Sequence, residues 1–270
     1  MKFFLWLVYL TLSFASCNSN SESKIQAPDS LQNLIQTIRD SIRKNPANRK
    51  FVFYLADELQ NEGKYKEAIQ VLDSMNIQKG DSVDLPVYFD YLFKRSELLE
   101  LEGDTIEAIK TLELFVTPGE LTQAGLRLTN LYAQTKNPKT LSSCEAMKKN
   151  DKSGKDPNPD YLEGIYYSNT GDFEKALIQF DKCVLKDYNF LDAHMEKGRV
   201  LYKQKKINEA LKAFELTLTL SNAYADAFFW KAKCLEALGQ MQEAKLNYQR
   251  AYGLDKSLIE AKEAAERINH

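Results

Sequence analysis

Residues 171–183 have the sequence GDFEKALIQFDKC, and residues 240–251 have the sequence QMQEAKLNYQRA. In both stretches an alanine is followed four residues later by an aromatic residue, a spacing that places the two side chains on one face of an α-helix. The same alanine recurs at positions 176, 210 and 244, so the interval from 176 to 210, counted in residues, equals the interval from 210 to 244. We call this interval the repeat interval. A constant interval of this length predicts a chain built from stacked helix pairs.

Many other positions keep the repeat interval over three consecutive copies. They are Phe180, Phe214 and Tyr248; Gly164, Gly198 and Ala232; Tyr167, Leu201 and Leu235; and Asp192, Asp226 and Glu260, each followed by alanine. We expect the glycines to face the alanines, so that the two helices of a pair approach closely, and the aromatic residues to fill the gap to the next repeat. Gly171 and Gly239 stand at the predicted turn between the helices, where Lys205 replaces glycine in the middle copy.

This pattern resembles the tetratricopeptide repeat (TPR), a helix-turn-helix unit with a small residue on its first helix and an alanine and an aromatic residue on its second. The resemblance implies an all-α fold, a right-handed superhelix of antiparallel helix pairs. It also implies a concave surface, lined by the first helices, that binds peptides or proteins.

Weaker copies of the repeat extend toward the N-terminus. Residues 63–72 and 103–112 each carry the alanine followed four residues later by leucine. The two alanines, Ala68 and Ala108, lie farther apart than the repeat interval, so we expect an insertion within residues 76–86. Residues 120–147 predict a degenerate repeat, because Glu145 stands where an aromatic residue belongs.

The repeats divide the chain into two halves with a helix at each end. The predicted segments are a signal peptide at 1–16, a lipidated Cys17 with a flexible tether to residue 28, an N-terminal capping helix at 29–46, three repeats at 47–156, three repeats at 157–257, and a C-terminal capping helix at 258–270. The polar, proline-containing residues 148–159 predict a hinge between the halves.

The N-terminus resembles a bacterial lipoprotein signal. An apolar run at residues 3–10 is too short to span a membrane, which takes about 20 residues, and the small residues Ala15 and Ser16 precede Cys17. The resemblance implies that the Cys17 thiol receives a diacylglycerol and becomes the mature N-terminus. Asn18, in place of aspartate, implies the outer membrane, facing the periplasm. The alternative is a soluble secreted protein with an unmodified cysteine.

Composition and motifs exclude several classes of function. The net charge is −2, from 36 basic and 38 acidic residues that are intermixed along the chain, so we expect no nucleic-acid partner. Asp192 and Glu196 share a helix face while His194 points away, which argues against a metal site; the other histidine is His270. We found no phosphate-binding glycine loop or nucleophile elbow, and expect neither a cofactor nor an enzyme.

The three cysteines after Cys17 show no paired spacing. Cys183 and Cys234 fall at repeat positions that are small or apolar in other copies, so we interpret them as core thiols, and we expect no disulfide framework with Cys144.

The resemblance also places a set of residues on the binding groove. They are Phe53, Asp57, Gln60, Phe93, Glu97 and Glu100 in the N-terminal half, and Tyr161, Ile165, Ser168, Asp192, Met195, Arg199, Tyr202, Lys203, Asp226, Phe229, Lys233 and Glu236 in the C-terminal half. Some members of the family hold a C-terminal carboxylate with asparagines, but Ile165, Arg199 and Lys233 replace them here, so we do not expect that ligand. The alternative is that the aromatic residues only pack between repeats and the charges only solvate the face.

These features predict a lipid-anchored scaffold of the cell envelope that binds a protein or peptide. The alternative is a small-ligand or glycan-binding lipoprotein of an uptake system, with aromatic rings stacked on sugars. A large dry pocket favours the alternative, and an open groove favours the scaffold. The basic groove residues of the C-terminal half predict an acidic partner segment there, and the acidic ones of the N-terminal half predict a different partner. The sequence identifies neither the partner nor the oligomeric state.

Overall fold

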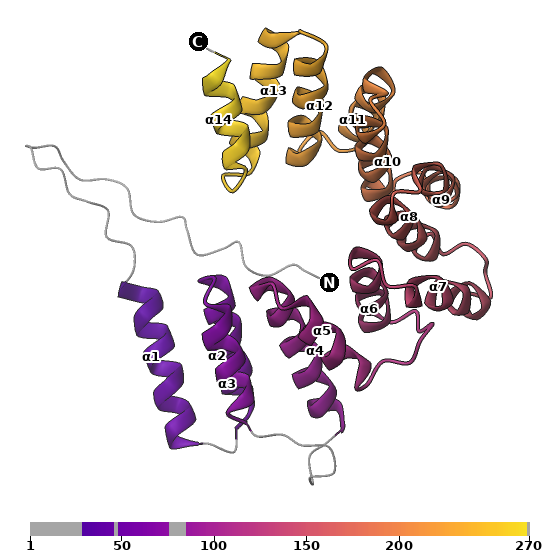
Figure 1. Ribbon diagram of the computed structural model, residues 1–270. Helices are drawn as coiled ribbons and strands as arrows, with labels where there is room; N and C mark the ends of the chain where they lie inside the picture. The colour runs from indigo at the N-terminus through magenta and orange to yellow at the C-terminus, as the bar shows by residue number, and fades with distance from the viewer. Residues whose placement is uncertain (1–28, 46–47, 76–84, 269–270) are drawn as a thin grey trace, which may run out of the picture.

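The computed structural model describes residues 29–45, 48–75 and 85–268. Over these residues the secondary structure consists of 14 α-helices without any β-strand. The helices stack one after another into a curved solenoid, with α1 (Asp29–Lys44) and α14 (Ile259–Arg267) at its two ends (Figure 1). This confirms the prediction of an all-α repeat superhelix.

Between the two end helices, the described residues form six helix pairs, each joined by a short turn. The pairs are α2 (Lys50–Asn61) with α3 (Tyr65–Asp73), α4 (Leu85–Glu102) with α5 (Thr105–Glu113), α6 (Gln123–Gln134) with α7 (Lys139–Asn150), α8 (Asn158–Thr170) with α9 (Phe173–Lys186), α10 (Leu191–Lys203) with α11 (Ile207–Leu220), and α12 (Ala225–Ala237) with α13 (Met241–Leu254). We call the even-numbered member of each pair its first helix. The 14 helices of the described residues equal the number predicted from the sequence, namely six helix pairs and two capping helices.

The recurrent spacing of glycine and aromatic residues has its cause inside each pair. A Cβ added to Gly164 of α8 would lie 2.7 Å from Cδ1 of Phe180 on α9 and closer still to Cε1, and one added to Gly198 of α10 would lie 2.6 Å from Cε1 of Phe214 on α11. Both rings are fully buried. The rings therefore lie over the glycine of their own pair. Glycine is needed at this position because any side chain there would occupy the space that the ring fills. The rings also reach the next repeat, as expected, because Phe180 shares a core cluster with Ala193 and Phe214 shares one with Ala227.

The turns between paired helices use the left-handed backbone region, as predicted. Gly171 and Gly239 have φ values of 88° and 78°. Lys205 adopts a φ of 64° at the equivalent position, although a side chain disfavours that conformation. The helix pair therefore keeps the same turn here at some cost in backbone energy.

The third repeat departs from the pattern in the way its second helix packs. Glu145 is exposed, and Cys144 and Met147 of α7 are fully buried instead. The buried face of α7 thus lies one residue away from the position that the repeat register assigns. The degenerate repeat still forms a helix pair.

The junction between the two halves is held by a buried carboxylate. Asp160 of α8 is only 3% exposed and forms ion pairs with Lys148 of α7 at 2.9 Å and Lys186 of α9 at 2.6 Å. Burial disfavours its charge, but the hydrogen bonds from the two lysines outweigh this and lower the pKa of Asp160. These contacts join three helices where residues 148–159 predicted a hinge, and they oppose hinge motion.

The end helices are single halves of repeats. Leu34 of α1 occupies the alanine position, one repeat interval before Ala68, and is 44% exposed because no described first helix precedes α1. Glu266 of α14 occupies the position of Ala232, and its charge keeps that outer face in water. Polar outer faces of this kind end repeat arrays.

Several predictions fall outside the described residues. They concern the signal peptide at 1–16, Cys17, the tether to residue 28, most of the expected insertion, which falls at 76–84, and His270. None of the helices in the described ranges is both long enough and apolar enough to cross a membrane.

Candidate functional site

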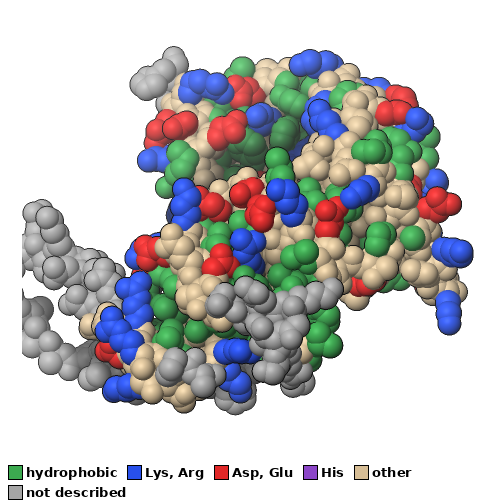
Figure 2. Space-filling model, turned by 60° about the horizontal axis from the view of Figure 1, so that its bottom comes forward, with side chains coloured by type: hydrophobic (Ala, Val, Ile, Leu, Met, Phe, Trp, Pro, Cys, Tyr) green, Lys and Arg blue, Asp and Glu red, His purple; other side chains and the backbone are tan. Residues whose placement is uncertain are grey.

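The first helices face the inside of the curve. In Figure 1, α6 and α8 lie on the inner side of the arc, and their second helices α7 and α9 lie on the outer side. Figure 2 shows acidic and basic side chains interspersed on one face of the molecule, with hydrophobic side chains between them and a hollow among them. A surface on which charges of both signs alternate with hydrophobic side chains suits a polar partner better than an apolar one.

An aromatic and cationic cluster joins two of the first helices. Trp230 of α12 is half-buried, and the ring of Tyr202 from α10 meets it edge-on at 5.6 Å between centroids. The guanidinium of Arg199 lies 5.1 Å from the centre of the Trp230 ring, and the ammonium of Lys233 lies 5.2 Å from it. At these distances the cations are attracted to the ring electrons. We call Arg199, Tyr202, Trp230 and Lys233 the Trp230 cluster.

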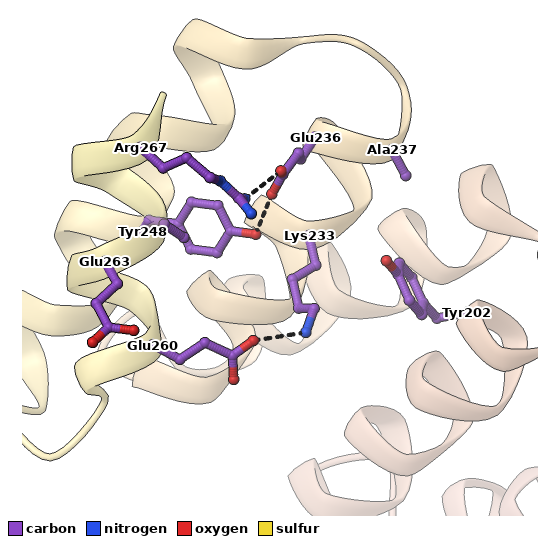
Figure 3. Close-up of a pocket in the computed structure, with 9 residues that line it drawn as sticks. Tyr202, Lys233, Glu236, Ala237, Tyr248, Glu260, Glu263 and Arg267 are labelled. Atoms are coloured by element: carbon purple, nitrogen blue, oxygen red, sulfur yellow. Dashed lines mark hydrogen bonds and ion pairs between the residues drawn. The ribbon is translucent and has the colours of Figure 1, made fainter. Parts of the chain in front are cut away.

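A cleft of about 560 Å³ opens beside the Trp230 cluster, between α10, α12, α13 and α14. Two charge contacts across it are drawn in Figure 3: Lys233 Nζ bonds to Glu260 at 3.0 Å, and Arg267 pairs with Glu236. Tyr248 donates its hydroxyl to Glu236 at 2.7 Å. Most of the lining residues are therefore charged or polar, and their charges are largely paired with one another.

Helix α14 contributes to the groove, although the sequence predicted it only as a cap. Glu260, Glu263 and Arg267 all line the cleft, and each lies one repeat interval after a predicted groove residue of α12. The helix therefore acts as the first helix of an incomplete further repeat. The repeat interval between α12 and α14 is present in the sequence, but the sequence analysis assigned this short helix only a capping role.

Most predicted groove residues of the C-terminal half reach the surface. Asp192 and Lys203 are exposed, and the half-exposed ones are Tyr161, Arg199, Tyr202, Asp226, Lys233 and Glu236. Tyr202, Lys233 and Glu236 come together at the cleft. Their role in binding stays a prediction.

Four predicted groove residues are instead part of the core. Met195 and Phe229 are 3% and 6% exposed, and Ile165 and Ser168 are also buried. Met195 packs in a cluster with Phe214, and Phe229 packs in a cluster with Tyr248. The first helix lies between its own partner and the next repeat, so these positions are covered and cannot contact a ligand in this conformation.

The groove position missed by the sequence analysis lies one residue further along each helix. Glu196 and Trp230 directly follow Met195 and Phe229, and both are half-exposed. A step of one residue turns the side chain by about 100° around the helix. Burial raises the pKa of Glu196, although the Arg199 guanidinium lies 2.9 Å away. The sequence does contain a signal for this groove position, because Glu196 and Trp230 are separated by the repeat interval.

In the N-terminal half, the predicted acidic residues are bound by cations that the sequence analysis did not consider. Lys94 of α4 pairs with Asp57 and Glu97 and donates to Gln60 at 2.7 Å. Arg127 of α6 pairs with Glu97 and with Glu100, the latter at 2.8 Å.

One aromatic residue predicted for the groove, Phe93, contacts this network, and another, Phe53, packs against the core. Arg127 lies 5.8 Å from the centre of the Phe93 ring, and Phe53 of α2 is half-buried against the core. The network spans α2, α4 and α6. The predicted contrast between an acidic and a basic half is therefore weakened, because the acids here are paired and Arg199 and Lys233 are paired as well.

The remaining histidine and the cysteines are structural. His194 is buried, and its Nε2 lies 2.9 Å from the carbonyl oxygen of Tyr188. Cys144, Cys183 and Cys234 are free and buried, which confirms the interpretation of the last two as core thiols. Burial raises the pKa of each thiol to about 12, so they stay protonated and unreactive at neutral pH.

Comparison with known proteins agrees with this geometry. Tetratricopeptide repeat models match residues 161–225 and 225–258, which together run from within α8 to beyond the end of α13. The chain is a tetratricopeptide repeat protein. No curated protein matches the sequence of this TPR protein.

Solved structures show the same fold along most of the chain. A tetratricopeptide repeat protein from Parabacteroides merdae is 17% identical with a TM-score of 0.71, over 89% of this chain and 93% of that one. A chain of the APC/C hetero-tetramer Cut9-Hcn1 is 15% identical with a TM-score of 0.54, over 90% of this chain and 46% of that one. At these identities the likeness concerns the fold. A TPR solenoid offers an extended concave surface for protein or peptide partners.

Proposed function

We propose that this TPR protein is a membrane-anchored scaffold of a bacterial cell envelope, and that it binds a partner protein through the C-terminal half of its concave face. The observation that carries the proposal is the Trp230 cluster at the edge of the cleft. Tryptophan, tyrosine and arginine are the residues most enriched at the energetic centres of protein interfaces.

The chemistry of the cleft favours a protein segment over a small ligand. Small-molecule pockets are lined mainly by apolar side chains with a few polar groups. Here the lining includes Lys233, Glu236, Glu260, Glu263 and Arg267, and the aromatic side chains are two tyrosines. Of the two tyrosines that line the cleft Tyr248 is buried, so Tyr202 is the one lining ring on which a sugar could stack.

The anchor rests on the sequence before the described residues. Small residues lead directly into Cys17, and a polar stretch separates it from α1. Two or three acyl chains on one protein hold it firmly to a bilayer, because each buried CH₂ contributes about 0.8 kcal/mol. A fully extended segment from Cys17 to Asp29 reaches at most about 40 Å, so the TPR array would stay close to the membrane.

The anchor is tested by replacing the cysteine. Cys17→Ser should move the protein from the membrane fraction to the soluble fraction, whereas the neighbouring Ser19→Ala should leave it in the membrane. Mass spectrometry of the wild-type N-terminus should show a lipid-modified Cys17. An unmodified N-terminus together with a Cys17→Ser variant that still sediments with membranes would refute the anchor.

The binding surface is tested by cross-linking on intact membranes, followed by purification of the scaffold. Tyr202→Ala should reduce the recovered partner strongly, since loss of a central aromatic residue typically costs about 2 kcal/mol or more. Tyr188→Ala is the matched control, because this exposed tyrosine lies before α10 and outside the cleft. Equal recovery with wild type and Tyr202→Ala, with both proteins folded, would place the binding site elsewhere.

A further inference from the structure

Three successive helices of the groove, α10, α12 and α14, share a carboxylate at one repeat position. Asp192, Asp226 and Glu260 occupy this position on α10, α12 and α14. Asp192 accepts a hydrogen bond from the Tyr224 hydroxyl at 2.6 Å. Neither Asp192 nor Asp226 forms an ion pair within the described part of the chain, and the same holds for Glu263 at the cleft.

The cations on the same face are mostly occupied. Arg199 pairs with Glu196, Lys233 with Glu260, and Arg267 with Glu236. Among the groove cations of α10, α12 and α14, Lys203 alone has no ion pair across the described residues. Once the internal pairs are set aside, this face therefore keeps more unpaired carboxylates than unpaired cations.

The ring faces in the groove also attract cations. Trp230 already holds two cationic groups of the chain near its ring, and Tyr202 and Tyr224 bring further rings to the same helices. Aromatic rings beside carboxylates attract ammonium and guanidinium groups through both the ring electrons and the charge. The half-exposed Glu196, whose pKa is raised by desolvation, would also be stabilised in its charged form by a further cation.

Resting on the proposed function, we propose that the segment bound in this groove is basic and presents Lys or Arg side chains to Asp192, Asp226 and Glu263. This reverses the acidic segment predicted from the sequence, where Arg199 and Lys233 were counted as free charges. Each exposed contact contributes little by itself. Together they select the partner, because complementary charge speeds association and like charge excludes competitors.

A random peptide library displayed on phage tests the inference without knowledge of the natural partner. The bait is the mature chain with Cys17→Ser, selected at moderate salt. The selected peptides should carry a net positive charge, with Lys and Arg enriched over the starting library. Selection of acidic or uncharged peptides would overturn the inference.

The selected peptide then serves as a probe for individual carboxylates. Trp230 is the single tryptophan after Cys17, so its fluorescence reports binding directly. Asp192→Asn and Asp226→Asn should each lower the affinity about two- to fivefold and weaken its dependence on salt. The control is Glu209→Gln on α11, an exposed acid on a second helix, which should leave the affinity unchanged.

The outcomes separate this inference from the proposed function. Peptides that lose affinity with Tyr202→Ala but carry acidic residues would overturn the basic partner and leave the groove as the binding site. If the affinity of the selected peptides is the same for Tyr202→Ala as for wild type, or no peptide is enriched, both proposals fail. Basic peptides that are weakened by Tyr202→Ala and by the two aspartate variants support both.

Discussion

Gly164→Ala is the most direct test of the close helix contact that defines this repeat. The new methyl group would lie 2.7 Å from Cδ1 of Phe180 and closer still to Cε1. The ring cannot move away freely, because it is fully buried and packs against Tyr161 at 6.1 Å between centroids.

Two opposing effects set the size of the change. Overpacking a buried site costs about 1–3 kcal/mol, and a contact this short lies toward the upper end of that range. Alanine in place of glycine inside a helix returns about 1 kcal/mol. We therefore expect the free energy of unfolding to fall by about 1–2 kcal/mol, or about 2–4 °C in melting temperature for each kcal/mol.

Urea denaturation followed by circular dichroism measures this effect, with Gly253→Ala as the control. Gly253 also lies in a helix, α13, but an added Cβ there meets nothing within 4 Å. That variant should gain up to about 1 kcal/mol through helix propensity alone. Combining Gly164→Ala with Phe180→Leu should recover part of the loss. If Gly164→Ala stabilises the protein as much as Gly253→Ala does, the close contact between α8 and α9 is wrong.

Three further predictions concern single side chains. Lys205→Gly should raise the free energy of unfolding by about 0.5–1 kcal/mol in urea denaturation, because the φ of 64° suits glycine; no gain would show that the turn is not strained. Asp160→Asn should destabilise the fold by about 1–3 kcal/mol at pH 7, since it leaves Lys148 and Lys186 without their shared carboxylate. Because folding lowers the pKa of Asp160, the carboxylate stabilises the fold fully at any pH above its unfolded pKa of about 3.9. This stabilisation is lost as the pH falls through the pKa of Asp160 in the folded state. The melting curves of variant and wild type should therefore converge in acid. Glu196→Gln should raise the melting temperature at pH 7, because the raised pKa of Glu196 means that folding disfavours its charged form. This gain should vanish below the unfolded pKa of about 4.3, where the carboxyl is already protonated. A variant that is less stable than wild type at pH 7 would contradict the prediction.

The fold was predictable because its signal is repeated. An error at one position is corrected by its equivalents in the neighbouring repeats, so Gly171 and Gly239 identified the turn even though Lys205 breaks the pattern. The third repeat was harder, because the buried face of α7 is shifted by one residue and Cys144 takes the place expected for residue 145.

The site was predicted less well because a groove depends on fine differences in helix orientation. Met195 and Phe229 are buried while Glu196 and Trp230 beside them reach the surface. Sequence periodicity locates the face of a helix to within about one residue, and here a shift of one residue is the difference between a core position and a groove position. Charge pairing between helices is likewise invisible in the sequence, since Lys233 and Glu260 meet only through the packing of α14 against its neighbours.

The central claim is that a partner protein occupies the concave face of the C-terminal half. The most direct measurement is site-specific photo-cross-linking in intact cells, with a photoreactive amino acid at position 202 in the cleft or at position 246, an exposed leucine on α13. We predict a discrete cross-linked adduct at position 202 that is absent at position 246. An adduct at position 246 with none at position 202 would contradict the claim and move the binding surface to the second helices.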